Sequence, residues 1–438
     1  MTDIAVGLAN ERADSRALIR YLLIAFLVLS LQPLYFFMMT NLNRVISHER
    51  SWQHIRDAFD AGVLETGYHS KHQYIDSGDR FTDCYSLGEG LEPGVSATVA
   101  GITASRPVSP DRHSCDDLRD AAQNPQGATW GRYDRYWHGY RIYSAPLASA
   151  FPIVVLKLLN LALLILVSAT FFIQSSKLIG TRPSLALIAP VLFCSDYVRI
   201  WHVTPHTVST AIIIGGSAIF AFALRRNAAT STLILISALF GSLFNFVDFL
   251  VNPPWMPMLL AFFVMASGRK SAIKTSLLCV GAWFVAYSVT WASKWIVAYI
   301  VDPSFNIGSD VLNTALFRIA GDNAKVLHFP LAASIQVIGN CLASWGTPLL
   351  IALVVFAWRR AKVSKFDRRA FAGYCWPALV PFGWFEILSN HSQIHAFFVS
   401  RSAAASIGVA FAAILLSVQL EETQTRDFGL ASNPALKP

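Results

Sequence analysis

Residues 20–40 of the chain have the sequence RYLLIAFLVLSLQPLYFFMMT, in which the only charged residue is the first. About 20 apolar residues in a helix are enough to cross the hydrocarbon core of a bilayer. The residues before this stretch are basic (Arg12, Arg16 and Arg20), but no small-x-small cleavage motif follows it. The stretch therefore predicts an uncleaved membrane anchor rather than a secretory signal peptide.

The same pattern recurs along the rest of the chain. Hydrophobic residues make up 54% of the 438 residues and charged residues only 14%, whereas a soluble domain carries about 25% charged residues. Further candidate spans lie near residues 150–173, 184–198, 206–224, 231–251, 256–267, 276–298, 331–358, 372–389 and 401–420. The sequence thus predicts an all-α polytopic membrane protein with about ten transmembrane helices.

Basic residues cluster in alternate connections between these spans. Four connections on one side hold thirteen of them: Lys177, Arg182, Arg225, Arg226, Arg269, Lys270, Lys274, Arg359, Arg360, Lys362, Lys365, Arg368 and Arg369. The short connections on the other side hold only Arg199, Arg318 and Lys325. Because cytoplasmic loops are enriched in Lys and Arg, we expect an even number of spans with both termini in the cytoplasm, in a bacterial inner membrane.

This topology divides the chain into five segments. They are a cytoplasmic N-terminus (1–19), a first transmembrane helix (20–40), a large extracytoplasmic loop (41–149), a multi-span domain (150–420) and a cytoplasmic tail (421–438). Because the net charge of +8 is concentrated between apolar runs, the expected partner is the lipid bilayer and not nucleic acid.

The loop 41–149 is the one sizeable polar region. Residues 45–65 have helical apolar spacing, which predicts a helix at the membrane surface, whereas residues 76–130 are rich in Gly, Pro, Ser and Asp and are expected to be irregular. Cys84 and Cys115 are the only cysteines outside the spans. In an oxidising compartment they are expected to form a disulfide, and two free thiols are the alternative.

Five ionisable side chains lie inside predicted spans: Lys157, Asp196, Asp248, Lys294 and Glu386. A charged group at the centre of a membrane helix costs about 2.5–3.5 kcal/mol on insertion scales, so such residues are functional candidates. The lysines can instead extend toward the headgroups, but carboxylates have short stems. Since the topology places all five in the outer half of their spans, we expect a polar cavity that opens outward.

Aromatic residues are concentrated in residues 130–143, which include Asp134, Trp137 and His138. Flat aromatic faces stack on sugar rings, and Arg and Asp bind hydroxyls or phosphate. An aromatic belt at the membrane interface is the alternative interpretation.

Two histidine pairs have the i, i+4 spacing that places side chains on one helical face: His202 with His206, and His391 with His395. Arg199 and Arg401 lie close to them in sequence. A metal site would need a third ligand at fixed spacing, which is missing, so no metal ligands are predicted. Protonatable or phosphate-binding histidines are favoured over ordinary interfacial ones.

Carboxylates and cations at a membrane boundary suit sugar transfer from a lipid-linked phosphosugar. A carboxylate base removes the proton of the acceptor hydroxyl, and cationic donors stabilise the departing phosphate. The candidate bases are Glu386, Asp248, Asp196 and Asp134. The candidate substrate-binding residues are Arg199, His202, His206, His391, His395, Arg401, Trp137 and His138. No cofactor motif is present, and the requirement for a divalent cation is left open.

The layout resembles the C-type superfamily of membrane glycosyltransferases. Those proteins have a cytoplasmic N-terminus, a large first outer loop, many further spans and an outward-facing site for polyprenyl-phosphate sugars. The resemblance covers the architecture and no specific motif. The family places an acidic residue soon after the first span, whereas residues 41–48 contain none before Glu49, so no catalytic residue is carried over.

This resemblance implies a glycosyltransferase that moves a sugar from a polyprenyl-phosphate-linked donor to a cell-envelope glycan or lipid acceptor. The alternatives are a transporter or flippase of a glycolipid or anionic solute, and an envelope polysaccharide polymerase. A transporter would favour two related halves, which the sequence does not show.

Overall fold

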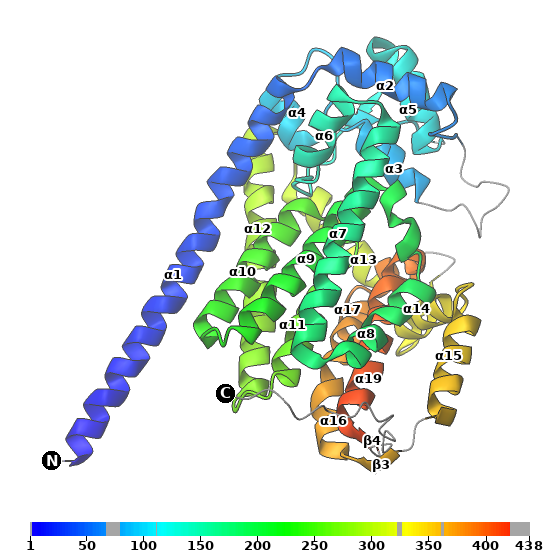
Figure 1. The fold of residues 1–438 in the computed structure, drawn as a ribbon. Coiled ribbons are helices and arrows are strands. Elements are labelled where there is room, and N and C mark those ends of the chain that lie inside the picture. Colours follow the sequence, from blue (N-terminus) through cyan, green and yellow to red (C-terminus); the bar gives the residue numbers. More distant parts are fainter. Residues whose placement is uncertain (1, 67–78, 111, 322–325, 361–362, 421–438) are drawn as a thin grey trace, which may run out of the picture.

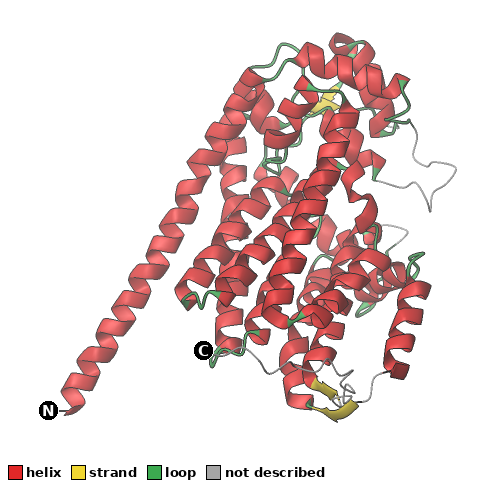
Figure 2. Ribbon diagram, in the orientation of Figure 1, coloured by secondary structure: helices red, strands yellow, loops and turns green. Residues whose placement is uncertain are grey.

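A computed structural model describes residues 2–66, 79–110, 112–321, 326–360 and 363–420. Helices dominate these ranges, as the sequence predicts, and the strands found in them form two short antiparallel pairs (Figure 2). One pair joins β1 (Arg106–Pro107) to β2 (Trp130–Gly131), and the other joins β3 (Val363–Phe366) to β4 (Val418–Leu420). The chain is therefore an all-α protein with a membrane-spanning composition.

The described residues between 48 and 150 form a head at one end of the molecule (Figure 1). Its helices are α2 (His48–Asp60), α3 (Arg80–Leu87), α4 (Ala97–Thr103), α5 (Ser114–Gln123), η1 (Pro125–Gly127) and α6 (Arg141–Ala150). The expected helix in residues 45–65 corresponds to α2. The prediction that residues 76–130 are irregular is wrong for α3, α4 and α5.

The polar residues that suggested irregular structure in this segment are helix caps. Asp79 and Ser96 accept hydrogen bonds from backbone N–H groups in the first turns of α3 and α4. Asp and Ser are preferred at this position because they satisfy donors that have no partner within the helix. The helices have only 8, 7 and 10 residues, which is too short for a clear hydrophobic period.

Within the described ranges, six helices are long and apolar enough to cross a membrane. They are α1 (Thr2–Val45), α7 (Ile153–Ile179), α9 (Thr204–Arg225), α10 (Thr230–Val247), α12 (Ala272–Val301) and α19 (Ala396–Ser417). A seventh crossing is the pair α14 (Ala332–Leu342) and α15 (Thr347–Arg360), which is bent by 82°. The structure thus supports six or seven spans.

The other three predicted spans are shorter or broken. Residues 184–198 and 256–267 overlap α8 (Thr181–Phe193) and α11 (Trp255–Ala266). Residues 372–389 overlap α16 (Arg368–Cys375), η4 (Trp376–Leu379) and α17 (Val380–Ile387). Pro377 and Pro381 stand in the first turns of η4 and α17, where proline is tolerated but a preceding helix cannot continue. The number of ten transmembrane spans therefore remains a prediction.

Four short elements connect these helices near the head. They are η2 (Tyr197–His202), the π-helical turn η3 (Ile307–Leu312), α13 (Asn313–Ala320) and α18 (Ser389–Ile394).

The outward faces of the long helices are apolar. Leu158, Ile165 and Leu166 on α7 are between 55% and 65% exposed, and α1 and α12 carry similar side chains. Contiguous exposed apolar surface of this extent is unfavourable in water and is typical of contact with lipid. Inside the bundle, α8 to α12 and α19 pack around a common hydrophobic core that includes Trp255 and Trp283.

Polar side chains attach α1 to the bundle. Gln32 donates to the Thr290 hydroxyl (3.1 Å) and accepts from the Ser293 hydroxyl (2.6 Å). Ser242 lies 2.7 Å from the Thr290 hydroxyl and 3.2 Å from the Tyr35 hydroxyl. Because helices in lipid gain no hydrophobic energy by association, such hydrogen bonds specify which helices pair.

The N-terminal end of α1 and the β3–β4 pair lie at the end of the molecule opposite the head (Figure 1). The basic cluster 359–371 includes β3 and the adjoining ends of α15 and α16. The structure therefore separates this cluster from the head by the length of the bundle. Lys325, Lys362 and the expected tail 421–438 lie outside the described residues.

A disulfide joins Cys84 of α3 to Cys115 of α5, with a sequence separation of 31 residues. Closing a loop of this size stabilises a folded chain by about 3–4 kcal/mol in the chain-entropy model. We therefore expect reduction to speed proteolysis within the head and to leave the spans protected, as measured by limited trypsin digestion in detergent with and without dithiothreitol. Cys375→Ser, which alters a cysteine outside the disulfide, is the control. Equal digestion rates before and after reduction would contradict the prediction.

Candidate functional site

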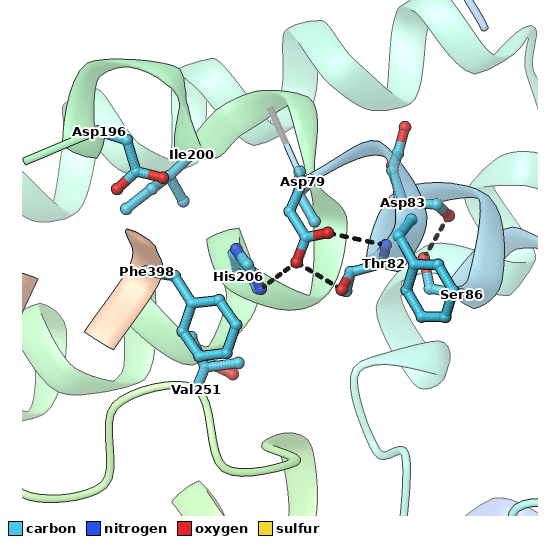
Figure 3. Close-up of polar contacts among 12 residues, drawn as sticks. Asp79, Thr82, Asp83, Ser86, Asp196, Ile200, His206, Val251 and Phe398 are labelled. Carbon is cyan, nitrogen blue, oxygen red and sulfur yellow. Dashed lines mark hydrogen bonds and ion pairs between the residues drawn. The ribbon is translucent and has the colours of Figure 1, made fainter. Parts of the chain in front are cut away.

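A carboxylate of the head points into the bundle at the start of α3. Asp79 accepts hydrogen bonds from the Thr82 N–H (3.1 Å) and the Thr82 hydroxyl (2.5 Å) (Figure 3). These bonds fix the orientation of the carboxylate, whose Oδ2 lies 3.5 Å from His206 Nε2. The Asp79 side chain is only 7% exposed.

The neighbours of His206 determine which of its ring nitrogens carries the proton. His206 lies in the first turn of α9, and its Nδ1 is 3.1 Å from Arg401 Nη2. A guanidinium can only donate, so Nδ1 accepts. The neutral ring therefore carries its proton on Nε2, which faces Asp79.

Arg401 of α19 completes this arrangement. Its Nε and Nη2 donate to the two carboxylate oxygens of Asp196, each at 2.6 Å. Its Nη1 is buried and has no hydrogen-bond partner in the part of the chain that the structure describes. An unpaired buried donor costs free energy, so Nη1 is a candidate donor to a ligand. We call Asp79, His206, Arg401 and Asp196 the acid–base series.

Apolar groups surround the series. Figure 3 shows Ile200 beside Asp196, Phe398 beside His206, and Val251 next to Phe398. Burial raises the pKa of Asp79, while the Thr82 hydrogen bonds and the charge of Arg401 oppose this rise. Desolvation disfavours the ionised form of a carboxylate, which strengthens it as a base once it is ionised.

The structure thus brings together three of the predicted site residues, Asp196, His206 and Arg401. Two more lie close to them around Phe398. The centroid of the Phe398 ring is 5.3 Å from that of His206, 5.1 Å from that of His395 and 6.3 Å from that of His391. His391 Nε2 also lies 3.2 Å from the carbonyl oxygen of Leu250.

Two predicted bases, Asp248 and Glu386, lie outside the acid–base series, and each forms hydrogen bonds to backbone N–H groups. Asp248 accepts from the Ser209 hydroxyl (2.8 Å) and from the N–H groups of Leu250 and Val251. Glu386 accepts from the N–H (2.9 Å) and hydroxyl (2.6 Å) of Ser334, at the start of α14. Both carboxylates therefore have structural partners.

We expect the substitution Asp248→Ala to lower the stability of the folded protein. Leu250 has a φ of +76°, a conformation that costs free energy for a non-glycine residue and that the Asp248 hydrogen bonds hold. Hydrogen bonds to a charged group contribute about 1.5–3 kcal/mol each, so thermal unfolding should occur at a lower temperature. The variant Asp248→Asn keeps one acceptor oxygen, so its unfolding temperature should fall by less than that of Asp248→Ala. An unchanged melting temperature for Asp248→Ala would refute this role.

The predicted residues of the aromatic stretch are buried between the head and the bundle. Trp137 Nε1 donates to the carbonyl of Thr290 (2.9 Å), and His138 Nδ1 lies 3.0 Å from Glu89 Oε1. Asp134 is also buried, and desolvation raises its pKa to about 6 although Lys294 attracts its charge. This stretch packs the head onto the membrane helices and does not join the acid–base series.

Arg199 and His202 lie on η2, beside a different surface. The ring of His202 packs on that of Trp201, with centroids 3.6 Å apart, and the His202 carbonyl accepts from Lys157 Nζ at 2.7 Å. The predicted shared face of His202 and His206 is not observed. A break occurs between them because η2 ends at His202, and α9 begins with Pro205 in its first turn.

Asp79 was not among the site residues predicted from the sequence. The available signal was an Asp three residues before Thr82, which is typical of a helix N-cap. Its contact with His206 depends on the folding of the head and could not be inferred from local sequence.

Among the described residues, no group of three or more His, Cys, Asp or Glu side chains is placed to hold a metal ion. No protein-family model matches the chain, and no curated protein or solved structure matches it significantly.

Proposed function

We propose that this chain is a membrane glycosyltransferase that moves a sugar from a polyprenyl-phosphate-linked donor to a cell-envelope glycan or lipid acceptor. The observation that carries the proposal is the acid–base series: a buried carboxylate base and an arginine with an unpaired N–H meet where the head joins the bundle.

Asp79 is the proposed general base. It accepts the proton of the acceptor hydroxyl as the acceptor oxygen bonds to the anomeric carbon. The bond from that carbon to the phosphate oxygen breaks, and the polyprenyl phosphate leaves with the bonding electrons. His206 acts as a positioning residue, because its Nε2–H faces Asp79 Oδ2 at 3.5 Å.

Arg401 is the proposed phosphate ligand. Its Nη1 supplies a donor to a phosphate oxygen, where negative charge grows as the bond breaks. Arg318 of α13 supports it, since its Nη1 is also buried without a partner among the described residues, and its charge acts on His391 and His395.

We further propose a bacterial inner-membrane location, cytoplasmic termini and an outward-facing head. The basic cluster at the end opposite the head supports this orientation. Ten spans result if α8, α11 and the α16–α17 region complete the crossings. The test is maleimide labelling of cysteines introduced at Asp60 and Lys365: labelling of position 365 alone in intact cells would reverse the topology.

The functional test combines purified protein with vesicles that contain polyprenyl-phosphate hexoses. Release of polyprenyl phosphate together with a new glycosidic product supports the proposal. Movement of the intact donor between leaflets without bond cleavage would support a flippase instead.

The pH dependence of this transfer follows from Asp79. A base acts in its ionised form, and the raised pKa of Asp79 means that it takes up a proton at a higher pH than an ordinary Asp, whose pKa is about 3.9. We therefore expect kcat/KM to fall on acidification at a pH above the pKa of an ordinary Asp. A pH profile that stays flat down to the ordinary Asp range would argue against Asp79 as the base.

A further inference from the structure

A cleft of about 320 Å³ lies between the head and α7. Five segments form its walls: residues 62–65 after α2, the first turns of α3, Cys115 of α5, the first turns of α7, and residues 201–203 at the end of η2. Neither Asp79 nor Arg401 lines it. The cleft is therefore a surface separate from the acid–base series.

The charges in the cleft are paired. Lys157 Nζ lies 2.5 Å from Asp83 Oδ2, and Arg80 Nη1 lies 2.5 Å from Glu65 Oε2. Among the lining residues that the structure describes, two cations and two carboxylates leave no net charge. Phosphate recognition depends on cationic donors that are not already neutralised by carboxylates, so this lining suits hydroxyl groups better than an anionic headgroup.

The mouth of the cleft is apolar and continues onto the lipid-facing side of α7. Val154 and Leu158 line the cleft and are 45% and 55% exposed. Ile165 and Leu166 extend the same helix into the span with similar exposure. A ligand with a polar headgroup and hydrocarbon chains can thus place the headgroup in the cleft and the chains along α7.

The cleft adjoins Asp79 through two shared elements. Asp79 caps α3, whose first turn supplies Arg80 and Asp83, and His206 follows the cleft residue His202 across the η2–α9 break. Figure 3 shows Thr82 between Asp79 and Asp83, and His206 on the other side of Asp79. The cleft and the proposed base therefore share α3 and the η2–α9 segment, which places a ligand in the cleft near Asp79.

We propose that this cleft binds the acceptor of the transfer, and that the acceptor is a membrane-anchored lipid with an uncharged, hydroxyl-bearing headgroup. This inference rests on the proposed function. It separates the two substrates: the phosphate of the donor binds at Arg401, and the acceptor binds between the head and α7.

The test uses the full-length protein with a photoreactive benzoylphenylalanine at position 158 or, as the matched control, at position 165. Leu158 and Ile165 have similar exposure on the same helix, but only Leu158 lines the cleft. Each variant is placed in phosphatidylcholine vesicles with equal amounts of labelled monoglucosyl diacylglycerol and phosphatidylglycerol. We expect position 158 to capture the glycolipid about 10-fold more than phosphatidylglycerol, a preference of about 1.4 kcal/mol, and position 165 to capture both equally.

Equal capture at position 158 would overturn the inference by showing ordinary lipid contact, and preferential capture of phosphatidylglycerol would overturn it by showing an anionic-lipid site. The transfer assay distinguishes this failure from that of the proposed function. Sugar transfer without selective capture defeats only the cleft assignment. Selective capture by a protein that cleaves no polyprenyl-phosphate donor defeats the proposed transfer and with it the acceptor role, leaving a glycolipid-binding site.

Discussion

Replacing Asp79 with Asn should lower the rate of sugar transfer by about 10³-fold, within the range of 10²–10⁴ that a general base contributes. The amide keeps the size of the side chain and can still accept from Thr82, so α3 retains its cap. It cannot take up the proton of the acceptor hydroxyl. The loss should therefore appear in kcat, measured with polyprenyl-phosphate donor in vesicles, and donor binding should change little.

The matched control is Asp57→Asn, which alters an exposed carboxylate of α2 that accepts a hydrogen bond from Gln53. It should transfer sugar at the rate of the unmodified protein. A folded Asp79→Asn protein with more than about one tenth of the normal kcat would exclude Asp79 as the base, since even a weak general base contributes about 10².

Replacing Arg401 with Gln should weaken donor binding about 100-fold, because hydrogen bonds to charged groups contribute about 1.5–3 kcal/mol. The substitution removes the unpaired Nη1 and both bonds to Asp196. The variant is also expected to be less stable, because breaking a buried ion pair is destabilising. Asp196→Asn separates the two effects: it weakens the pair but leaves Nη1, so it should lower stability and change donor affinity by less than about 10-fold.

Arg269→Gln is the control for Arg401. Arg269 also has a buried Nη1 without a partner within the described ranges, and it donates to the Ala228 carbonyl. It lies at the start of α12, whose other end contacts the head through Asp302 and Arg132. Donor affinity should be unchanged in this variant, as measured by titration with polyprenyl phosphate. Equal loss of affinity in Arg269→Gln and Arg401→Gln would assign the effect to general destabilisation.

Hydropathy predicted the helical fold and the membrane environment because both follow from composition and run length. It did not predict where helices break. The ends of α8, η4 and α17 depend on local turns and on Pro377 and Pro381, which a hydropathy window averages with their apolar neighbours.

The candidate site was predictable only on its membrane side. Asp196, His206 and Arg401 stood out because ionisable residues are costly near spans. Asp79 belongs to a polar loop, where an acidic residue is ordinary, and its role depends on a contact made 127 residues later in the chain, at His206. Asp248 and Glu386 met the same criterion of cost, but their hydrogen bonds join backbone and hydroxyl groups, whereas Asp79 also faces His206.

The hydrogen bonds between α1 and the bundle affect the order in which the protein matures. Gln32 is synthesised early, whereas Ser242 and Thr290 follow 210 and 258 residues later. During translation α1 therefore enters the bilayer before the hydrogen-bond partners of the Gln32 amide on α10 and α12 have been synthesised. These bonds form late because they require the insertion of α10 and α12, so a ribosome stalled before residue 242 would leave the first helix in contact with α4 but not bonded to the bundle.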